Sequence, residues 1–178
     1  YVIGSQEMTA ALIRCQSNKQ EIIIPRLIKH ESPKYIVTSI SYEAFKKSNV
    51  ESVKFEPNSE LQVIWTEAFS NSKLTSSVIP SHVTQICKSA FSRCRQLTRV
   101  LFEPNSELKI IEKYAFAFSN LSSILIQARV KKICEGAFIA CNHLASIDFE
   151  PNSECQAIEK RSCSSFKLTS LRIPASLV

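Results

Sequence analysis

Apolar and polar residues alternate in six short stretches of this chain. Each stretch has apolar residues at its first, fourth and sixth positions, except that Ser77 takes one of these places. Since successive side chains of a strand point to opposite faces, each stretch is predicted to be a short β-strand that buries its apolar residues on one side. The predicted strands are 50–55, 74–79, 97–102, 121–126, 144–149 and 168–173.

A second motif, Ile-x-x-x-Ala-Phe, comes before each predicted strand. Five copies begin at positions 40, 64, 86, 111 and 133, and a degenerate sixth begins at Ile158. Beyond the motif, apolar residues recur at steps of three or four, as in Ala90, Phe91, Cys94 and Leu97, which is the spacing of one helix face. We therefore expect short helical turns on the convex side of the coils. The phenylalanines of the motif are expected to stack as a core spine.

The segment Phe55-Glu-Pro-Asn-Ser-Glu-Leu61 is repeated at a constant interval. It returns at Phe102–Leu108 and, with Cys155 in place of the leucine, at 149–155, so that its copies begin 47 residues apart. Each 47-residue unit contains two copies of the other motifs, which makes half a unit one coil of a solenoid. Such arrays bind partners on extended surfaces and seldom have a catalytic pocket.

Asn58, Asn105 and Asn152 occupy the same place in the three copies. They follow the last apolar position of a strand by three residues, where we expect a buried amide that hydrogen-bonds backbone groups at the bend. The proline before each asparagine fixes φ, and asparagine tolerates the conformations of a tight turn, so the same residues also predict a turn.

The first 35 residues differ from the rest. Two segments, Thr9–Arg14 and Glu21–Ile24, flank the polar residues 16–20, a pattern typical of a β-hairpin with a longer loop. Because a terminal coil must cover an otherwise bare core, residues 1–35 are predicted to be an N-terminal cap. Residues 36–178 then form the repeat array, which we interpret as a C-terminally incomplete piece of a longer one.

Composition fits a folded protein and argues against two kinds of contact. The apolar fraction is 44%, the charged fraction is 21%, and a net charge of +6 is scattered along the chain. Basic residues without interleaved aromatic ones are typical of a solvated surface, so no nucleic acid is expected as a partner. No apolar run approaches the ~20 residues of a membrane helix, so direct membrane insertion of this segment is not expected.

Seven cysteines, an odd number, lie at 15, 87, 94, 134, 141, 155 and 163. Equivalent pairs such as Cys94 and Cys141 are two coils apart, about 10 Å, which is too far for a disulfide. Pairs on neighbouring coils, Cys134 with Cys155 or Cys141 with Cys163, remain open. Cys94 and Cys141 are interpreted as small apolar residues of the core.

Candidate chemistry is sparse in this sequence. Metal sites need closely spaced ligands such as Cys-x-x-Cys, and phosphate loops need several glycines, whereas the chain has no such cysteine pair and only Gly4 and Gly136. Glu56, Glu103 and Glu150 come two coils apart and are interpreted as turn residues. We therefore predict a non-catalytic protein without a metal or a cofactor.

Three successive segments resemble a known family. They are Leu74-Thr-Ser-Ser-Val-Ile-Pro80, Val83-Thr-Gln-Ile86 and Ala90-Phe-Ser-Arg-Cys-Arg-Gln-Leu97, and they resemble the BspA-like leucine-rich-repeat family of bacterial and protozoan proteins. The resemblance implies a right-handed α/β solenoid with one parallel β-sheet on its concave side. It also implies adhesion or recognition, since many members lie on the cell surface.

The predicted binding face is the outward side of the concave sheet. On each strand the residue between the last two apolar positions points outward, and parallel stacking brings these residues into one column. Val78, Leu101 and Leu125 are adjacent in that column, and an apolar strip with a polar rim has the form of an interaction site. Arg99 is the best single anchor, because arginine is enriched among interface hot spots. The predicted partner-binding residues are Val78, Arg99, Leu101, Ser123, Leu125, Asp148 and Arg172.

Two functions fit such a face, and both need a protein partner. The first is a recognition or adhesion module of an extracellular or surface protein, which the family resemblance implies. The second is an intracellular scaffold, for example one associated with the cytoskeleton, which unpaired cysteines favour because disulfides are rare in reducing compartments. A signal peptide or membrane anchor in the full-length chain would decide for the surface.

Overall fold

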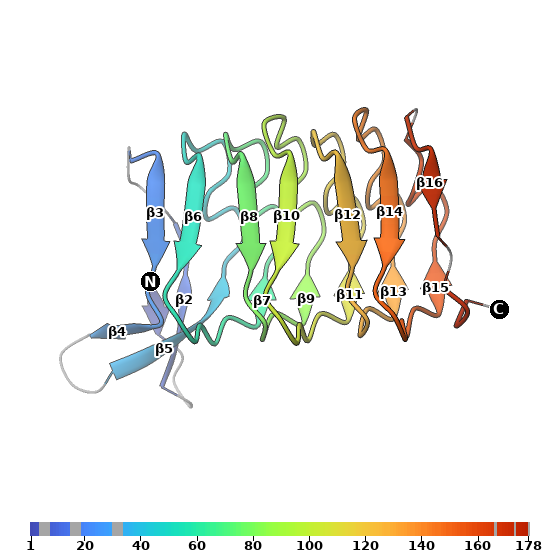
Figure 1. Cartoon of the computed structure of the whole chain (residues 1–178). Coiled ribbons are helices and arrows are strands. Elements are labelled where there is room, and N and C mark those ends of the chain that lie inside the picture. Colours follow the sequence, from blue (N-terminus) through green and yellow to red (C-terminus); the bar gives the residue numbers. More distant parts are fainter. Residues whose placement is uncertain (4–7, 15–18, 30–33, 166, 173, 178) are drawn as a thin grey trace.

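The fold is a solenoid in which each coil contains one longer and one short strand (Figure 1). The computed structural model describes residues 1–3, 8–14, 19–29, 34–165, 167–172 and 174–177. The longer strands are β3 (Glu21–Ile24), β6 (Ser52–Phe55), β8 (Ser76–Ile79), β10 (Arg99–Phe102), β12 (Ser123–Ile126) and β14 (Ser146–Phe149), and β16 (Ser170–Leu171) continues their series with two residues. The short strands are β7 (Val63–Ile64), β9 (Gln85–Ile86), β11 (Ile110–Ile111), β13 (Lys132–Ile133) and β15 (Ala157–Ile158).

Parallel pairing joins successive coils. The longer strands form two sheets, ordered β3-β6-β8-β10 and β12-β14-β16. Behind them the short strands continue a third parallel ladder and run in the opposite direction (Figure 1). The six predicted repeat strands are confirmed, but the prediction of one sheet was wrong. Each coil must return along the back of the core, and the residues that begin the Ile-x-x-x-Ala-Phe motifs pair there as well.

The N-terminal hairpin predicted from residues 9–24 was also wrong. β2 (Thr9–Leu12) pairs in parallel with β5 (Lys34–Ile40), whereas β3 pairs in parallel with β6. The two segments therefore extend two different ladders, since their alternating apolar residues suit the solenoid core as well as a hairpin. Antiparallel pairing joins β1 (Val2–Ile3) to β2, and β4 (Leu27–Lys29) to β5. The division of the chain at residue 35 stays a prediction.

The segments predicted to be helical are stacked turns, and no helix forms in the described part of the chain. We call the side of the solenoid that these turns form the turn face; the turns are residues 42–48, 66–72, 88–94, 113–119 and 135–141, and their inward side chains belong to the core. Its backbone amides alternate between two kinds of partner. Ala68 N donates to Trp65 O in its own turn at 3.1 Å, whereas Phe69 N donates to Ala90 O of the next coil at 2.8 Å. Every second amide is thus used to join coils, which leaves too few for a helix.

Left-handed residues explain why each turn bends away from a helix. Each segment of the turn face holds two of them four positions apart, such as Glu67 with φ of 56° and Asn71 with φ of 57°. A helix requires negative φ at successive residues, so a positive value at every fourth position ends it. Only Gly136 among these positions is a glycine, and the sequence therefore conceals the turns.

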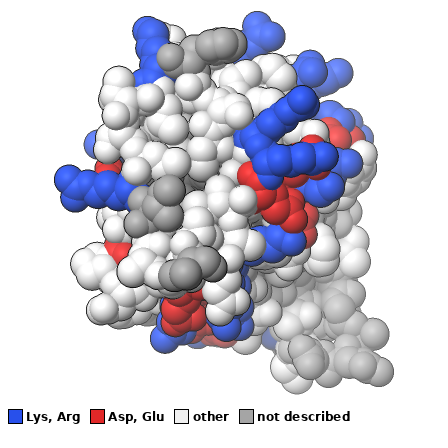
Figure 2. All heavy atoms as spheres, turned by 90° about the vertical axis from the view of Figure 1, so that its right-hand side faces the viewer, with Lys and Arg blue, Asp and Glu red and all other residues white. Residues whose placement is uncertain are grey.

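The predicted core spine is confirmed. The rings of Phe45, Phe69, Phe91, Phe116 and Phe138 are buried and stack with centroid separations from 4.8 to 5.4 Å and interplanar angles no greater than 9°. The apolar residues of both strand types pack around this stack into one continuous core. At the end that carries β16, charged side chains gather around the edge and uncharged ones lie at the centre (Figure 2).

The asparagines of the repeated heptapeptide have a different role from the one predicted. Asn58, Asn105 and Asn152 are exposed, so the expectation of a buried amide was wrong. All three have φ between 58° and 60°, which confirms that they serve a tight turn. The next residue makes the side-chain contact instead: Ser106 Oγ accepts a hydrogen bond from Leu108 N at 3.4 Å, and Ser59 does the same for Leu61.

Six cysteines are free, and Cys15 lies outside the described residues. Cys94 and Cys141 are fully buried, as predicted for core positions. Their sites are not entirely apolar, because Cys94 Sγ donates to Phe69 O at 3.0 Å and Cys141 Sγ donates to Phe116 O at 3.1 Å. The other coils described carry serine at this place, including Ser72 and Ser119, which suits a site with a carbonyl acceptor.

Candidate partner-binding face

The outward side of the longer strands exposes the three apolar residues predicted for it. Val78 is 46% exposed, and Leu101 and Leu125 are each 47% exposed. β8 and β10 pair so that Val78 lies opposite Leu101. Neighbouring residues of these strands, such as Val100 and Ile124, point into the core and are buried. Period-two alternation therefore places one apolar set inside and leaves a second, shorter set outside.

Polar and charged residues border this apolar strip. Arg99 lies opposite Ser76 at one side of Leu101, and Ser123 lies opposite Ser146 at the corresponding side of Leu125. Towards the C-terminal end, Leu125 is paired with Asp148, whose Oδ1 atom is 3.8 Å from Arg172 Nε. Arg172 is thus already paired with Asp148. Arg99, in contrast, forms no ion pair with another described residue, so its charge is available to a partner.

The column of outward residues also includes an exposed apolar residue that sequence reasoning missed. Ile23 is 62% exposed and lies opposite Lys54 in the β3–β6 ladder, so it extends the column of outward residues by one strand. The sequence analysis assigned Ile23 to a strand of the hairpin cap rather than to the array. Recognising Glu21–Ile24 as a repeat strand would have found it. Lys54 forms an ion pair with Glu21 of the same strand as Ile23.

Glutamates of the repeated heptapeptide bind three of the coils to the coil before. Glu103 Oε2 accepts a hydrogen bond from Ser81 N at 2.9 Å, and Glu150 Oε2 accepts one from Ala128 N at 2.9 Å. Glu56 does the same for Arg26 N at 2.8 Å. We call these three contacts the glutamate bridges. They explain why glutamate recurs at this place, since each satisfies a backbone amide that the preceding turn leaves unpaired.

The bridges tie the ends of β6, β10 and β14 to the preceding coil, and the junction that follows β10 is open. β10 pairs with β8 over four residue pairs, whereas no ladder pair joins β10 to β12. At their start the two strands still meet, since Ser122 N donates to Thr98 O at 3.2 Å. The turn after β10 is also longer: nine positions separate Phe102 from Ile111, compared with seven between Ile79 and Ile86.

A hollow of about 480 Å³ lies at this open junction. Leu101 and Leu125 line it together with other residues of β10 and β12. Arg99 lines it at the start of β10, while Glu103 and Glu150 line it beyond the ends of the strands. The arrangement can receive an apolar side chain between the leucines and can contact polar groups on either side of it.

Nucleophilic chemistry has little support at the cysteines. Burial raises the pKa of the Cys94 thiol to about 11 and that of Cys87 to about 12. Burial also raises the pKa of Cys134, Cys141 and Cys155, so these thiols stay protonated at neutral pH, although the thiolate is the reactive form. The described residues contain no group of three or more histidine, cysteine or acidic side chains placed to hold a metal ion.

A parallel β-solenoid that buries the apolar positions of a leucine-rich repeat defines the class of this protein. The chain belongs to the family described as BspA type Leucine rich repeat region, whose sequence model matches residues 18–106 and 62–178 with six copies. No curated protein matches the chain. The residues that carried the resemblance in the sequence therefore identify the family correctly.

Two solved structures share this fold. The pneumococcal vaccine antigen PcpA is 23% identical with a TM-score of 0.68, and the alignment covers 76% of this chain and 41% of that one. A leucine rich cell surface protein from Faecalibacterium prausnitzii A2-165 is 22% identical with a TM-score of 0.50, over 86% of this chain and 52% of that one. The chain thus spans about half or less of the length of either neighbour.

A search of the described residues for a membrane span gives a negative result: they include no helix of sufficient length and apolar character to cross a bilayer.

Proposed function

We propose that this chain is a non-catalytic protein-recognition module that binds a partner across the apolar strip formed by Val78, Leu101 and Leu125. The observation that carries the proposal is the hollow between β10 and β12, which places two half-exposed leucines around an open cavity. Contiguous exposed apolar surface is uncommon unless it serves an interaction. Leucine-rich-repeat solenoids commonly bind proteins on such extended faces.

The seven residues proposed to contact the partner divide into two roles. Val78, Leu101 and Leu125 supply apolar area at the centre, where interfaces gain most of their binding energy. Arg99, Ser123, Asp148 and Arg172 form the polar border, where they select the partner's charge and hydrogen-bonding groups. Arg99 is the strongest candidate among them, because it lines the hollow and is exposed.

We further propose that the module works at the cell surface. The neighbour from Faecalibacterium prausnitzii is described as a cell surface protein, and the family resemblance implies adhesion or recognition. One observation favours the alternative of an intracellular scaffold: six described cysteines are free although the fold brings several coils close together. Antibody labelling of intact and permeabilised cells separates the two, since only a surface protein is labelled on intact cells.

A surface-binding or pull-down assay with Leu101→Asp/Leu125→Asp tests the binding face. Two carboxylates in the hollow should abolish most partner binding, because a buried interface position tolerates an unpaired charge poorly. Trp65→Asp is a matched control, since Trp65 is 46% exposed but follows the short strand β7 on the other ladder. Thermal melts establish first that each variant is folded. Undiminished binding by the folded double variant would move the site off this face.

A further inference from the structure

Phe118, on the turn face, is an aromatic residue at a position where the other coils carry polar or small residues. Phe118 is 49% exposed and has φ of 58°. The equivalent positions in other coils carry Lys47, Asn71, Arg93 and Ala140, which are polar or small and are also left-handed. A bulky aromatic residue is unfavourable in that conformation and gains little from burial there. Strained and exposed positions of this kind are typical of functional sites.

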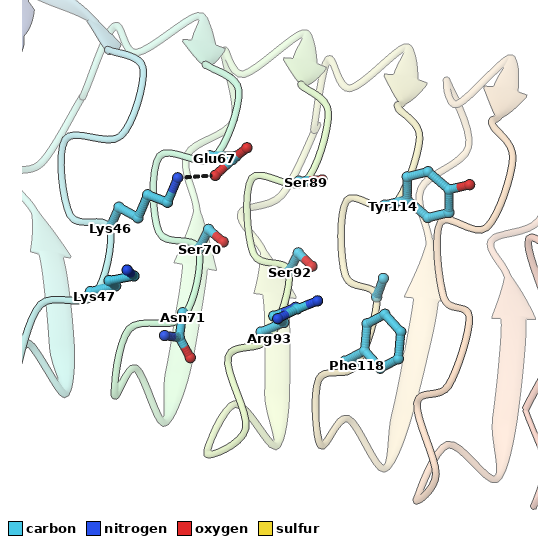
Figure 3. Close-up of a pocket in the computed structure, with 11 residues that line it drawn as sticks. Lys46, Lys47, Glu67, Ser70, Asn71, Ser89, Ser92, Arg93, Tyr114 and Phe118 are labelled. Atoms are coloured by element: carbon cyan, nitrogen blue, oxygen red, sulfur yellow. Dashed lines mark ion pairs between the residues drawn. The ribbon is translucent and has the colours of Figure 1, made fainter.

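Three hollows on the turn face meet at this ring. Phe118 lines one of about 460 Å³ shared with Arg93 and Tyr114, a second of about 300 Å³ shared with Arg95, and a third of about 600 Å³ shared with Arg161. In the first, the side chains of Arg93, Tyr114 and Phe118 project from neighbouring coils on the same side (Figure 3). The ring is therefore accessible from several directions, although it lies within a recessed surface.

Positive charge dominates the lining of these hollows. Arg93, Arg95 and Arg161 are exposed, and none forms an ion pair with another described residue. The guanidinium carbon of Arg93 lies 5.7 Å from the centroid of the Phe118 ring, in a cation–π contact that holds the two side chains together. Glu67 is the acidic residue among the described side chains that line them, and it is already paired with Lys46 at 2.5 Å (Figure 3).

Tyr114 completes the aromatic wall, and a glycine makes room for it. A Cβ atom added to Gly136 would lie 2.6 Å from Cε1 of Tyr114, so the tyrosine ring packs directly over this glycine. Gly136 is the only glycine among the left-handed residues that the structure describes, and it lies in the coil that follows the one with both aromatic residues. The local structure is thus arranged around Tyr114 and Phe118.

We propose that Phe118 and the arginines around it form a second docking site, which binds an acidic peptide segment of a protein partner through an apolar side chain of that segment. Carboxylates of the segment contact Arg93, Arg95 and Arg161, while its apolar side chain packs on Phe118. The site lies on a different face from the strip of Val78, Leu101 and Leu125. Its binding can therefore be tested independently of the function proposed above.

The shape and composition of the site favour a peptide over other anionic ligands. A bilayer surface cannot enter recessed hollows, whereas a single side chain can. A sulfated glycan would use the arginines but would leave the apolar surface of Phe118, Ile139 and Ala140 without a partner. Paired aromatic and arginine residues are the side chains that most often dominate protein interfaces.

Fluorescence polarisation with short synthetic peptides tests the proposal. The probes are a peptide of aspartates and glutamates with a central phenylalanine, the same peptide with a central serine, and a basic version with lysines. The wild-type chain should bind the first more tightly than the second and should not bind the third. Binding of the first should weaken as salt is raised, because exposed charge pairs are screened.

Phe118→Asn is the decisive variant, since Asn71 has the same left-handed conformation at the equivalent position and the substitution should leave the fold intact. It should weaken binding of the phenylalanine peptide about tenfold, the usual effect of losing one aromatic anchor. Arg93→Gln/Arg161→Gln should reduce both affinity and salt dependence. Leu101→Asp/Leu125→Asp should bind this peptide normally, which separates the two faces.

Equal binding by wild type and folded Phe118→Asn would overturn the proposal, as would failure of the wild type to prefer the acidic phenylalanine peptide. Heparin and phosphatidylserine vesicles are tested in parallel. If either binds in a manner that depends on Phe118 while the peptide does not, the ligand is a glycan or a lipid and the assignment to a peptide is wrong.

Discussion

Phe116 and Phe118 are two residues apart and have opposite environments. Phe116 is fully buried in the ring stack, 5.2 Å from the ring of Phe91 and 5.4 Å from that of Phe138. Phe118 is half exposed on the turn face. Alternation of the backbone at this place separates a residue that stabilises the fold from one available for binding, and the two should respond differently to truncation.

Phe116→Ala should lower the free energy of unfolding by about 3–5 kcal/mol, because it opens a cavity in a continuous stack. Phe118→Ala is the matched control and should change stability by about 0.5 kcal/mol or less, as is usual for surface substitutions. Urea denaturation of both variants checks this expectation. Similar losses in the two variants would mean that the ring stack is not the core of the coil.

The buried thiols predict how stability changes with pH. Burial raises the pKa of Cys94 to about 11, whereas an unfolded cysteine titrates at about 8.5. Above that value the unfolded chain loses a proton that the folded protein keeps, so stability should fall as pH rises from about 8.5 towards 11. Below pH 8 this thiol should not change the stability with pH, because it is protonated in both the folded and the unfolded chain.

Cys94→Ser isolates this contribution, because Ser72 and Ser119 occupy the same place in other coils and serine has no group that titrates in this range. Melting curves of wild type and variant across alkaline pH should converge, with the wild type falling more steeply. Parallel curves would show that Cys94 is not shielded from water in the folded state.

At the scale of the element, the strands and the ring stack could be predicted, and the turns could not. The alternation in segments such as 97–102 fits a strand and no other element. The recurring phenylalanines likewise fit only a core position. The spacing of Ala90, Phe91, Cys94 and Leu97 fits a helix face, but it equally fits turns that repeat every fourth residue. Glycine usually marks a left-handed position in a sequence, but here glutamate, asparagine or tyrosine occupies such positions. The period of the apolar residues alone did not distinguish a helix from stacked turns.

The candidate site was predictable to a similar extent. Period-two alternation identified Val78, Leu101 and Leu125 as outward residues. The open junction between β10 and β12 was not predictable, because segments 97–102 and 121–126 alternate like the strands that do pair, and only the ladders of the folded chain show the break. Phe118 was missed because an expected helix offered no reason to single out one residue of its outer surface.

The glutamate bridges give a prediction of their own. Glu103→Ala removes the acceptor for Ser81 N and should cost about 1.5 kcal/mol, the usual contribution of a hydrogen bond to a charged group. Glu103→Gln keeps an oxygen acceptor and should cost about 0.5 kcal/mol. Glu107→Ala, on the same turn, serves as the control. Denaturant midpoints check the order, and an equal loss for the alanine and glutamine variants would argue against the bridge.

At the scale of the whole molecule, the solenoid presents separate surfaces on one continuous core. The longer strands carry the apolar strip and its hollow, and the turn face carries Phe118 with its arginines. The short-strand ladder joins the coils behind them (Figure 1). Since each coil contacts only its neighbours, substitutions on one face should leave the other faces intact. This independence allows each proposed surface to be tested by itself.

Side-chain footprinting by carbene labelling tests the central claim most directly. The chain is labelled alone and in complex with the partner recovered in the binding assay, and labelling is quantified by residue. We predict that labelling of Val78, Leu101 and Leu125 falls sharply in the complex while that of Trp65 on the other ladder stays unchanged. Unchanged labelling of all three strip residues, together with protection elsewhere on the solenoid, would contradict the account.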